Sequence, residues 1–192
     1  MIRILVLEQT YLSNTGYWRL YRPLDVMRQL YPGVFHLTYK YERMTYADIM
    51  EHDIVITRRP SGGDAGALVK LIEKARMQGR HVIFDEDDAV MACPDTHELY
   101  SVFQKKEVRE MYTAALRCAS QFWFSTPAFL ETIHPEGLVI PNAILPIDMP
   151  DEPTPDLGLF GWQGKSIQVH DLMAGRTWYD ANKDKAAAWI FF

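Results

Sequence analysis

Short runs of consecutive apolar residues recur along the first 140 residues, each followed by a polar turn and then by a segment with helical spacing. These runs predict strands at residues 2–7, 34–39, 53–57, 81–84, 121–125 and 137–140. A strand that is apolar on consecutive residues is buried on both faces, as a parallel sheet between two helix layers requires. The pattern therefore predicts an α/β fold with a doubly wound, mostly parallel sheet.

The segments between these runs have the apolar spacing of helices. Helices are expected at residues 18–30, 46–50, 64–79, 98–119 and 127–133. Asp64 is placed to cap the start of the third helix, and Gly79 is placed to end it.

The composition changes near residue 141. Five prolines and four acidic residues fall between residues 141 and 156, which predicts an extended linker at 146–156 after a first domain at 1–145. Residues 157–192 contain one expected strand, at 157–162, and one expected helix, at 167–185. One strand and one helix cannot enclose a core. We therefore expect this part to begin a second domain, or else to pack on the first domain or on a second copy.

The composition excludes several classes of protein. With 192 residues, 48% of them hydrophobic, the chain can bury a core and is not disordered. A net charge of −5 argues against binding nucleic acid mainly through counterion release. No apolar stretch can span a bilayer, and the first apolar run is too short for a leader. Cys93 and Cys118 fit no metal or disulfide spacing, so a cytoplasmic location is expected.

Four acidic residues, Asp85–Asp88, follow the fourth expected strand directly. The carboxyl ends of strands are where open α/β sheets bind ligands, so Asp85, Asp87 and Asp88 are candidate catalytic residues. Their mutual repulsion must be answered by a cation or by hydrogen bonds.

Several answers to that repulsion remain open. The acids can bind a divalent cation, cap the next helix, or pair with Arg58, Arg59 or Arg80. A metal-dependent phosphohydrolase also uses an Asp-x-Asp after a strand. It needs a small hydroxyl residue two places beyond the second Asp, where this chain has Ala89.

Two turns that contain glycine supply further candidates. Residues 13–16 precede Tyr17 and Arg19, and residues 161–166 precede His170. A helix start after such a turn suits an anionic or hydroxyl-rich ligand. Neither turn has the glycine spacing of a dinucleotide or phosphate loop, so a nicotinamide cofactor is not supported.

Six segments resemble, in order and spacing, the amino-terminal half of GT-B glycosyltransferases and the opening of their second domain. The segments are residues 16–23, 53–60, 82–88, 124–127, 139–143 and 161–172. The most similar group is that of the family-4-like enzymes of bacteria and their phages.

The resemblance implies two Rossmann-like domains that face each other across a cleft. The first would bind an acceptor, which is unknown here, and the second would bind a nucleotide sugar as co-substrate. No tightly bound cofactor is implied, and a divalent metal is not expected, because helix ends and basic groups neutralise the leaving diphosphate.

The resemblance also implies a role for individual residues. Those that would orient or deprotonate an acceptor hydroxyl are Asp85, Asp87 and Asp88. Those that would line the acceptor side are Gly16, Tyr17, Arg19, Thr126 and Asn142. Those that would bind the donor are Gly161, Gly164, Lys165 and His170.

The chain departs from the family in its last part. No Glu follows Glu152, although the family holds its donor sugar with acidic residues late in the second domain. Half a cleft cannot hold both substrates in attack geometry, so we expect the 192-residue chain alone to be inactive or weak. Two alternatives stay open: an inactive module that binds a glycan, a nucleic acid or a protein, and a metal-dependent phosphohydrolase that uses Asp85–Asp88. The apolar tail at 186–192 could also join two copies.

Overall fold

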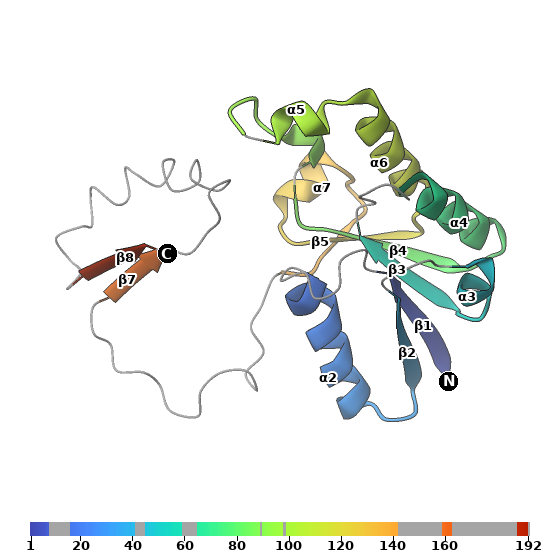
Figure 1. The fold of residues 1–192 in the computed structure, drawn as a ribbon. Helices are drawn as coiled ribbons and strands as arrows, with labels where there is room; N and C mark the ends of the chain where they lie inside the picture. Colours follow the sequence, from blue (N-terminus) through green and yellow to red (C-terminus); the bar gives the residue numbers. More distant parts are fainter. Residues whose placement is uncertain are drawn as a thin grey trace.

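A computed structural model describes residues 1–7, 16–40, 45–58, 65–88, 90–97, 99–141, 159–162 and 188–191. Its main feature is one all-parallel sheet with the strand order β2-β1-β3-β4-β5-β6 (Figure 1). The strands are β1 (Ile2–Leu7), β2 (Phe35–Lys40), β3 (Ile54–Arg58), β4 (His81–Glu86), β5 (Gln121–Phe124) and β6 (Leu138–Val139). The α/β, Rossmann-like fold predicted from the apolar runs is therefore confirmed.

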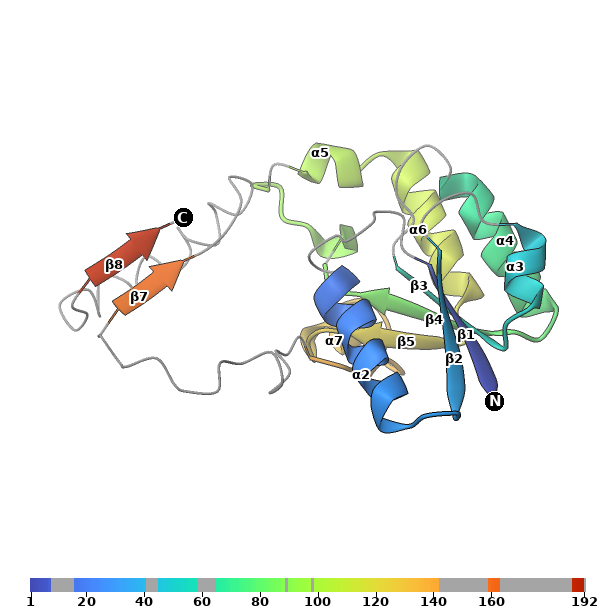
Figure 2. The same ribbon diagram turned by 60° about the horizontal axis from the view of Figure 1, so that its bottom comes forward.

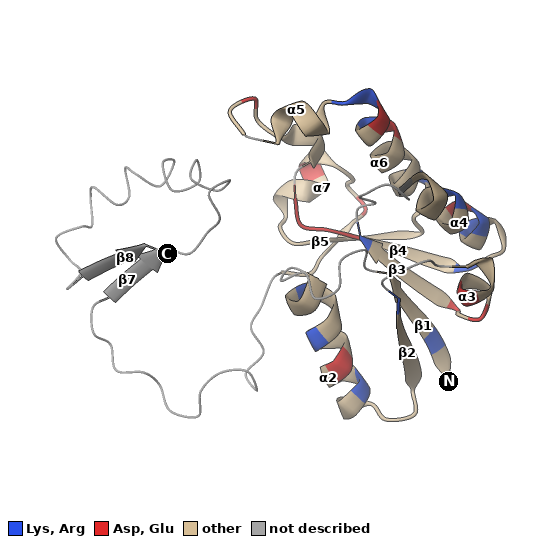
Figure 3. Ribbon diagram, viewed as in Figure 1, with Lys and Arg blue, Asp and Glu red and all other residues tan. Residues whose placement is uncertain are grey.

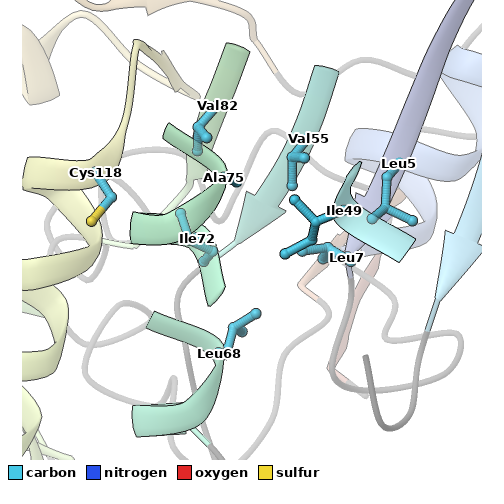
Figure 4. Close-up of a cluster of buried hydrophobic side chains, with 9 residues drawn as sticks. All are labelled: Leu5, Leu7, Ile49, Val55, Leu68, Ile72, Ala75, Val82 and Cys118. Carbon is cyan, nitrogen blue, oxygen red and sulfur yellow. The ribbon is translucent and has the colours of Figure 1, made fainter. Parts of the chain in front are cut away.

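Alternate residues of the central strands fill two separate parts of the core. Leu5 of β1 and Val82 of β4 pack in one cluster (Figure 4), and Val6 and Ile83, the next residue in each strand, pack in another. All four are at most 5% exposed. Because successive side chains of a strand point to opposite faces, the consecutive apolar residues of these strands bury both faces of the sheet.

Helices cover both faces (Figures 1 and 2). A single π-helical turn, η1 (Tyr17–Tyr21), and α2 (Arg22–Leu30) pack on one face. On the other face lie α3 (Tyr46–Met50), α4 (Ala65–Met77) and α6 (Lys106–Cys118).

The first expected helix, at 18–30, is built in two parts. The backbone N–H of Arg22 bonds to the carbonyl of Tyr17, which closes the wider π-helical turn before α2 begins. Pro23 lies in the first turn of α2, where its missing N–H disrupts no hydrogen bond within the helix. The backbone stays helical from η1 into α2, so the segment accommodates Pro23 next to the change from π-helical to α-helical bonding.

The long helix expected at 98–119 is wrong in its extent. A 3₁₀ turn, η2 (Val90–Ala92), and the short helix α5 (Tyr100–Phe103) precede α6, and Lys105 between α5 and α6 has extended backbone with ψ of 132°. Phe103 packs against a core cluster that contains Phe84 and Tyr112. Packing of this aromatic side chain overrides the continuous helical spacing of the sequence.

Helix ends follow the sequence where they are described. Gly79 has a φ of 75°, a left-handed conformation that suits glycine after a helix, and it follows α4 as expected. Asp64, its expected cap, lies outside the described residues. Thr45 caps α3 in a reciprocal arrangement with Asp48. The expected helix at 127–133 is α7 (Ala128–Thr132).

Two further strands form a separate parallel pair: β7 (Leu159–Trp162) and β8 (Ala188–Phe191). Pairing of β8 with β7 was not expected, since the sequence suggested only an apolar tail there. The linker at 146–156 and the helix at 167–185 lie outside the described residues, so the domain boundaries remain predictions. None of the helices in the described segments is long and apolar enough to cross a bilayer.

Candidate functional site

The acidic run lies at the carboxyl edge of the sheet, beside the end of the neighbouring strand. Asp85 and Glu86 are the last two residues of β4, and Asp85 is in register with Arg58, the last residue of β3. Figure 3 shows the acidic segment continuing from β4 past the tip of β3. Parallel strands place all their carboxyl ends on one edge, which brings this acidic run to a basic strand end.

Arg19 of η1 holds the first of these acids. Its Nε lies 2.9 Å from Oδ2 of Asp85, and its Nη2 donates to Oδ1, so the pair is bidentate. Both side chains are at most 3% exposed. Burial alone lowers the pKa of Arg19, but the hydrogen bonds and charge of Asp85 outweigh it and raise that pKa above its usual value. Nη1 also donates to the carbonyl of Ile140 at 3.1 Å.

Arg58 bridges two of the acids. Its Nε lies 3.5 Å from Oδ2 of Asp85, and its Nη2 pairs with Oδ1 of Asp87. Burial raises the pKa of Asp87, although the positive charge of Arg58 opposes that shift. The repulsion that the sequence indicated is thus answered by two arginines, and Arg58 is one of the three partners named from the sequence.

Glu86 shapes the turn that carries the last two acids. Its side chain is buried, and Oε1 accepts hydrogen bonds at 3.1 Å from the backbone N–H groups of both Asp87 and Asp88. These bonds fix the chain as it leaves the sheet. Asp88 is the exposed member of the four, so its carboxylate can reach a ligand from solvent.

A divalent cation has three oxygen donors close together here. One carboxylate oxygen from each of Glu86, Asp87 and Asp88 lies within 4.8 Å of the others. One oxygen of Glu86 already accepts two amides, and Asp87 already pairs with Arg58. A cation would therefore compete with bonds that the protein makes within itself.

Comparisons with known proteins give little to compare with this site. No protein-family model matches the chain, and no curated protein matches it significantly in sequence. Among solved structures, the crystal structure of a conserved protein from Enterococcus faecalis V583 is similar over 73% of this chain and 92% of that chain, at 12% sequence identity and a TM-score of 0.35.

Three other predicted site residues, Gly16, Tyr17 and Thr126, lie within the described part of the chain. Gly16, at the start of η1, is buried, and Tyr17 packs edge-on against Trp18 with ring centroids 5.0 Å apart. Thr126 is exposed and follows β5. Because Glu86 pairs in register with Phe124, the residues that follow β4 and β5 leave the sheet side by side.

Of the predicted donor-binding residues, the described part of the chain contains Gly161. Gly161 lies within β7, in register with Ile190 of β8. The others, together with one predicted acceptor residue, lie outside the described residues: Asn142, Gly164, Lys165 and His170.

Sequence reasoning missed the pairing of Arg19 with Asp85. The resemblance placed Arg19 against the acceptor, whereas the structure has it buried against a carboxylate 66 residues away. The role of Glu86 in the turn was also missed. The pairing of Arg19 with Asp85 could have been inferred from topology, because the turns after β1 and β4 share the carboxyl edge of the sheet. Nothing in the sequence indicates the role of Glu86.

The arrangement separates two kinds of carboxylate. Asp85 and Glu86 are buried and committed to an arginine pair and to backbone amides. Asp88 is exposed at a turn of fixed shape, and Asp87 has a raised pKa. The buried pair can position the turn, Asp87 is paired with Arg58, and the exposed carboxylate of Asp88 can accept a hydrogen bond from a ligand hydroxyl.

Proposed function

We propose that the chain is the acceptor-side part of a glycosyltransferase that uses a nucleotide sugar. The observation that carries the proposal is the carboxylate of Asp88, exposed at the end of β4 on a turn fixed by Glu86. The order of the six sequence segments that resemble GT-B enzymes supports the same assignment.

In this proposal, the outer acids act on an acceptor hydroxyl. Asp88 accepts a hydrogen bond from the hydroxyl and orients its oxygen, and a carboxylate at this position can take the proton as the glycosidic bond forms. Asp87, whose pKa burial raises, binds a proton more readily than an ordinary aspartate. Arg19 and Arg58 are positioning residues, because both act through Asp85 or Asp87.

The test is acceptor-dependent release of nucleoside diphosphate. The 192-residue chain, with and without a polypeptide that completes the second domain, is incubated with a panel of nucleotide sugars and hydroxylated acceptors. Asp88→Asn should reduce the completed enzyme about 100-fold, the lower end of the usual contribution of a general base. The matched control is Glu107→Gln, an exposed acid in the first turn of α6, which should retain full activity. Absence of release from every donor, or equal activity of both variants, would contradict the proposal.

A metal-dependent phosphohydrolase is the second candidate, favoured by the three carboxylate oxygens within 4.8 Å of one another. It predicts phosphate release from a phosphomonoester that requires Mg²⁺ or Mn²⁺ and stops in a chelator. The glycosyltransferase proposal predicts sugar transfer that persists in the chelator. An inactive binding module would show neither reaction, yet would retain ligand binding when the outer acids are replaced by Asn.

A further inference from the structure

The opposite edge of the sheet has a pocket that the proposed function does not use. Its volume is about 590 Å³, within the range of small-molecule sites. It is lined by the last turns of α4 and α6, by the starts of β4 and β5, and by the turn before β6. His81 of β4 lines the pocket, and Asp85, the first residue of the acidic run, lies four residues further along the same strand, roughly 13 Å away at about 3.3 Å per residue.

The lining of this pocket is strongly basic. The lining includes three arginines and two histidines but one acidic residue. They are Arg76, Arg80, Arg117, His81 and His134, and the acidic residue is Glu136. The whole chain carries a net charge of −5, so this concentration of positive charge runs against its composition. Figure 3 shows basic residues on α4, one of the two helices that end here.

Two helix ends account for part of this charge. The carbonyl ends of α4 and α6 carry partial negative charge, which favours a cation in the last turn of each helix. Arg76 of α4 supplies a cation at the end of α6, because its Nη1 donates to the carbonyl of Ala119, the residue that follows α6. The same Nη1 lies 3.4 Å from Oγ of Ser120. The last turns of α4 and α6 supply Arg76 and Arg117, and Arg80 and the two histidines come from outside these helices, so the helix ends do not explain their presence.

The remaining donors are incompletely used. Among the described residues, the exposed side chain of Arg117 makes no hydrogen bond or ion pair. Arg80 donates from Nη2 to the carbonyl of Met50 at 3.0 Å, but in the same described part of the chain its buried Nε has no hydrogen-bond partner. A ligand with several anionic oxygens would satisfy such donors.

His134 adds a donor of fixed orientation. Its ring stacks on Phe122 with centroids 4.1 Å apart and an interplanar angle of 25°. Its Nδ1 accepts the backbone N–H of Glu136 at 3.3 Å, so the proton of the neutral ring is on Nε2. The ring is thus held with one nitrogen as a hydrogen-bond donor.

We propose that this pocket binds a small molecule that carries phosphate groups. Planar guanidinium groups match phosphate oxygens in pairs, and Arg117 is the group that the protein leaves available for this. The inference is independent of the glycosyltransferase proposal, because none of its residues belongs to the acidic run.

Calorimetric titration of the full-length chain with inorganic pyrophosphate tests the pocket, at a constant ionic strength of about 0.15 M so that nonspecific attraction is screened. We expect saturable binding at one site per chain below about 1 mM. Arg117→Gln should weaken the affinity about tenfold, the loss of one charge-assisted hydrogen bond. Arg28→Gln is the matched control, because Arg28 is an exposed arginine in the last turn of α2, and it should change the affinity less than twofold.

A second measurement locates the bound pyrophosphate on the chain. Amide resonances of Ala119, Ser120 and Gly137 should shift in the wild-type chain as pyrophosphate is added, and Asp88→Asn should leave both the shifts and the affinity unchanged. Absence of saturable heat, equal weakening by the two arginine variants, or shifts confined to other parts of the chain would overturn the proposal.

Discussion

Replacing Asp85 by Asn should strongly destabilise the fold. The substitution leaves the guanidinium of Arg19 in a site where its side chain is 3% exposed, without the charge that balances it. Breaking a buried ion pair from one side costs about 3–5 kcal/mol. Asn keeps one oxygen that can still accept a hydrogen bond, so we expect the lower end, about 3 kcal/mol. That is a large fraction of the ~5–15 kcal/mol that stabilises an ordinary domain.

Equilibrium unfolding in urea measures this loss. With a denaturant slope of about 2 kcal/mol per M, a loss of about 3 kcal/mol lowers the urea midpoint by roughly 1.5 M. Asp88→Asn is the control, since Asp88 is exposed, and it should cost less than about 1 kcal/mol. If both variants lower the midpoint equally, the pairing with Arg19 does not stabilise the fold and the reasoning fails.

A double-mutant cycle separates the pair from its surroundings. Arg19→Met combined with Asp85→Leu removes both charges, so the double variant should be more stable than the sum of the two single losses implies. The expected coupling is about 1–3 kcal/mol for groups in direct contact. Additive losses would mean that the two side chains stabilise the fold through other neighbours.

Three smaller predictions concern other parts of the sheet domain. A hydrogen bond from Lys40 lowers the pKa of Asp48 to about 2, so the stability that this group contributes is present above about pH 4 and is lost as the pH falls toward 2. Asp48→Asn should therefore lower the free energy of unfolding by about 1 kcal/mol at pH 7, a figure reduced because the Lys40 pair is partly exposed. The urea midpoint of this variant should also change less with pH, between about pH 4 and pH 2, than that of the wild-type chain. Gly137→Ala should cost about 1–3 kcal/mol in thermal unfolding, because the new Cβ would lie 2.3 Å from the buried ring of Phe124. Burial raises the pKa of the Cys118 thiol, so it should react with a thiol reagent only under conditions that unfold the chain.

Much of the sheet could be predicted because burial on both faces is encoded locally. Strands β1 and β4 each contain a run of consecutive apolar residues, and each strand was expected within two residues of its observed ends. The short helix α3 was expected at its observed bounds, where Thr45 and Asp48 supply a reciprocal cap. Local rules were sufficient at these positions because tertiary packing agrees with them.

The rest depended on contacts between distant residues. The interruption near Lys105 follows from where Phe103 packs, which no helical spacing reports. The acidic run was located correctly at a strand end, yet its division into buried and exposed members is set by Arg19 and Arg58, which come from other elements. Sequence spacing cannot indicate which of four adjacent acids an arginine will reach.

The bond between Arg19 and the carbonyl of Ile140 joins groups 121 residues apart, and its ion pair with Asp85 spans 66 residues. During synthesis at about 5–20 residues per second, Arg19 would therefore wait roughly 3–13 s for its acidic partner to be made, and longer for Ile140. Throughout that interval the nascent first helix has a cation that cannot enter the core alone. The sheet domain should accordingly finish folding late during synthesis on the ribosome. Slower translation before residue 140 would lengthen the time for which the unfinished domain is exposed to chaperones and proteases.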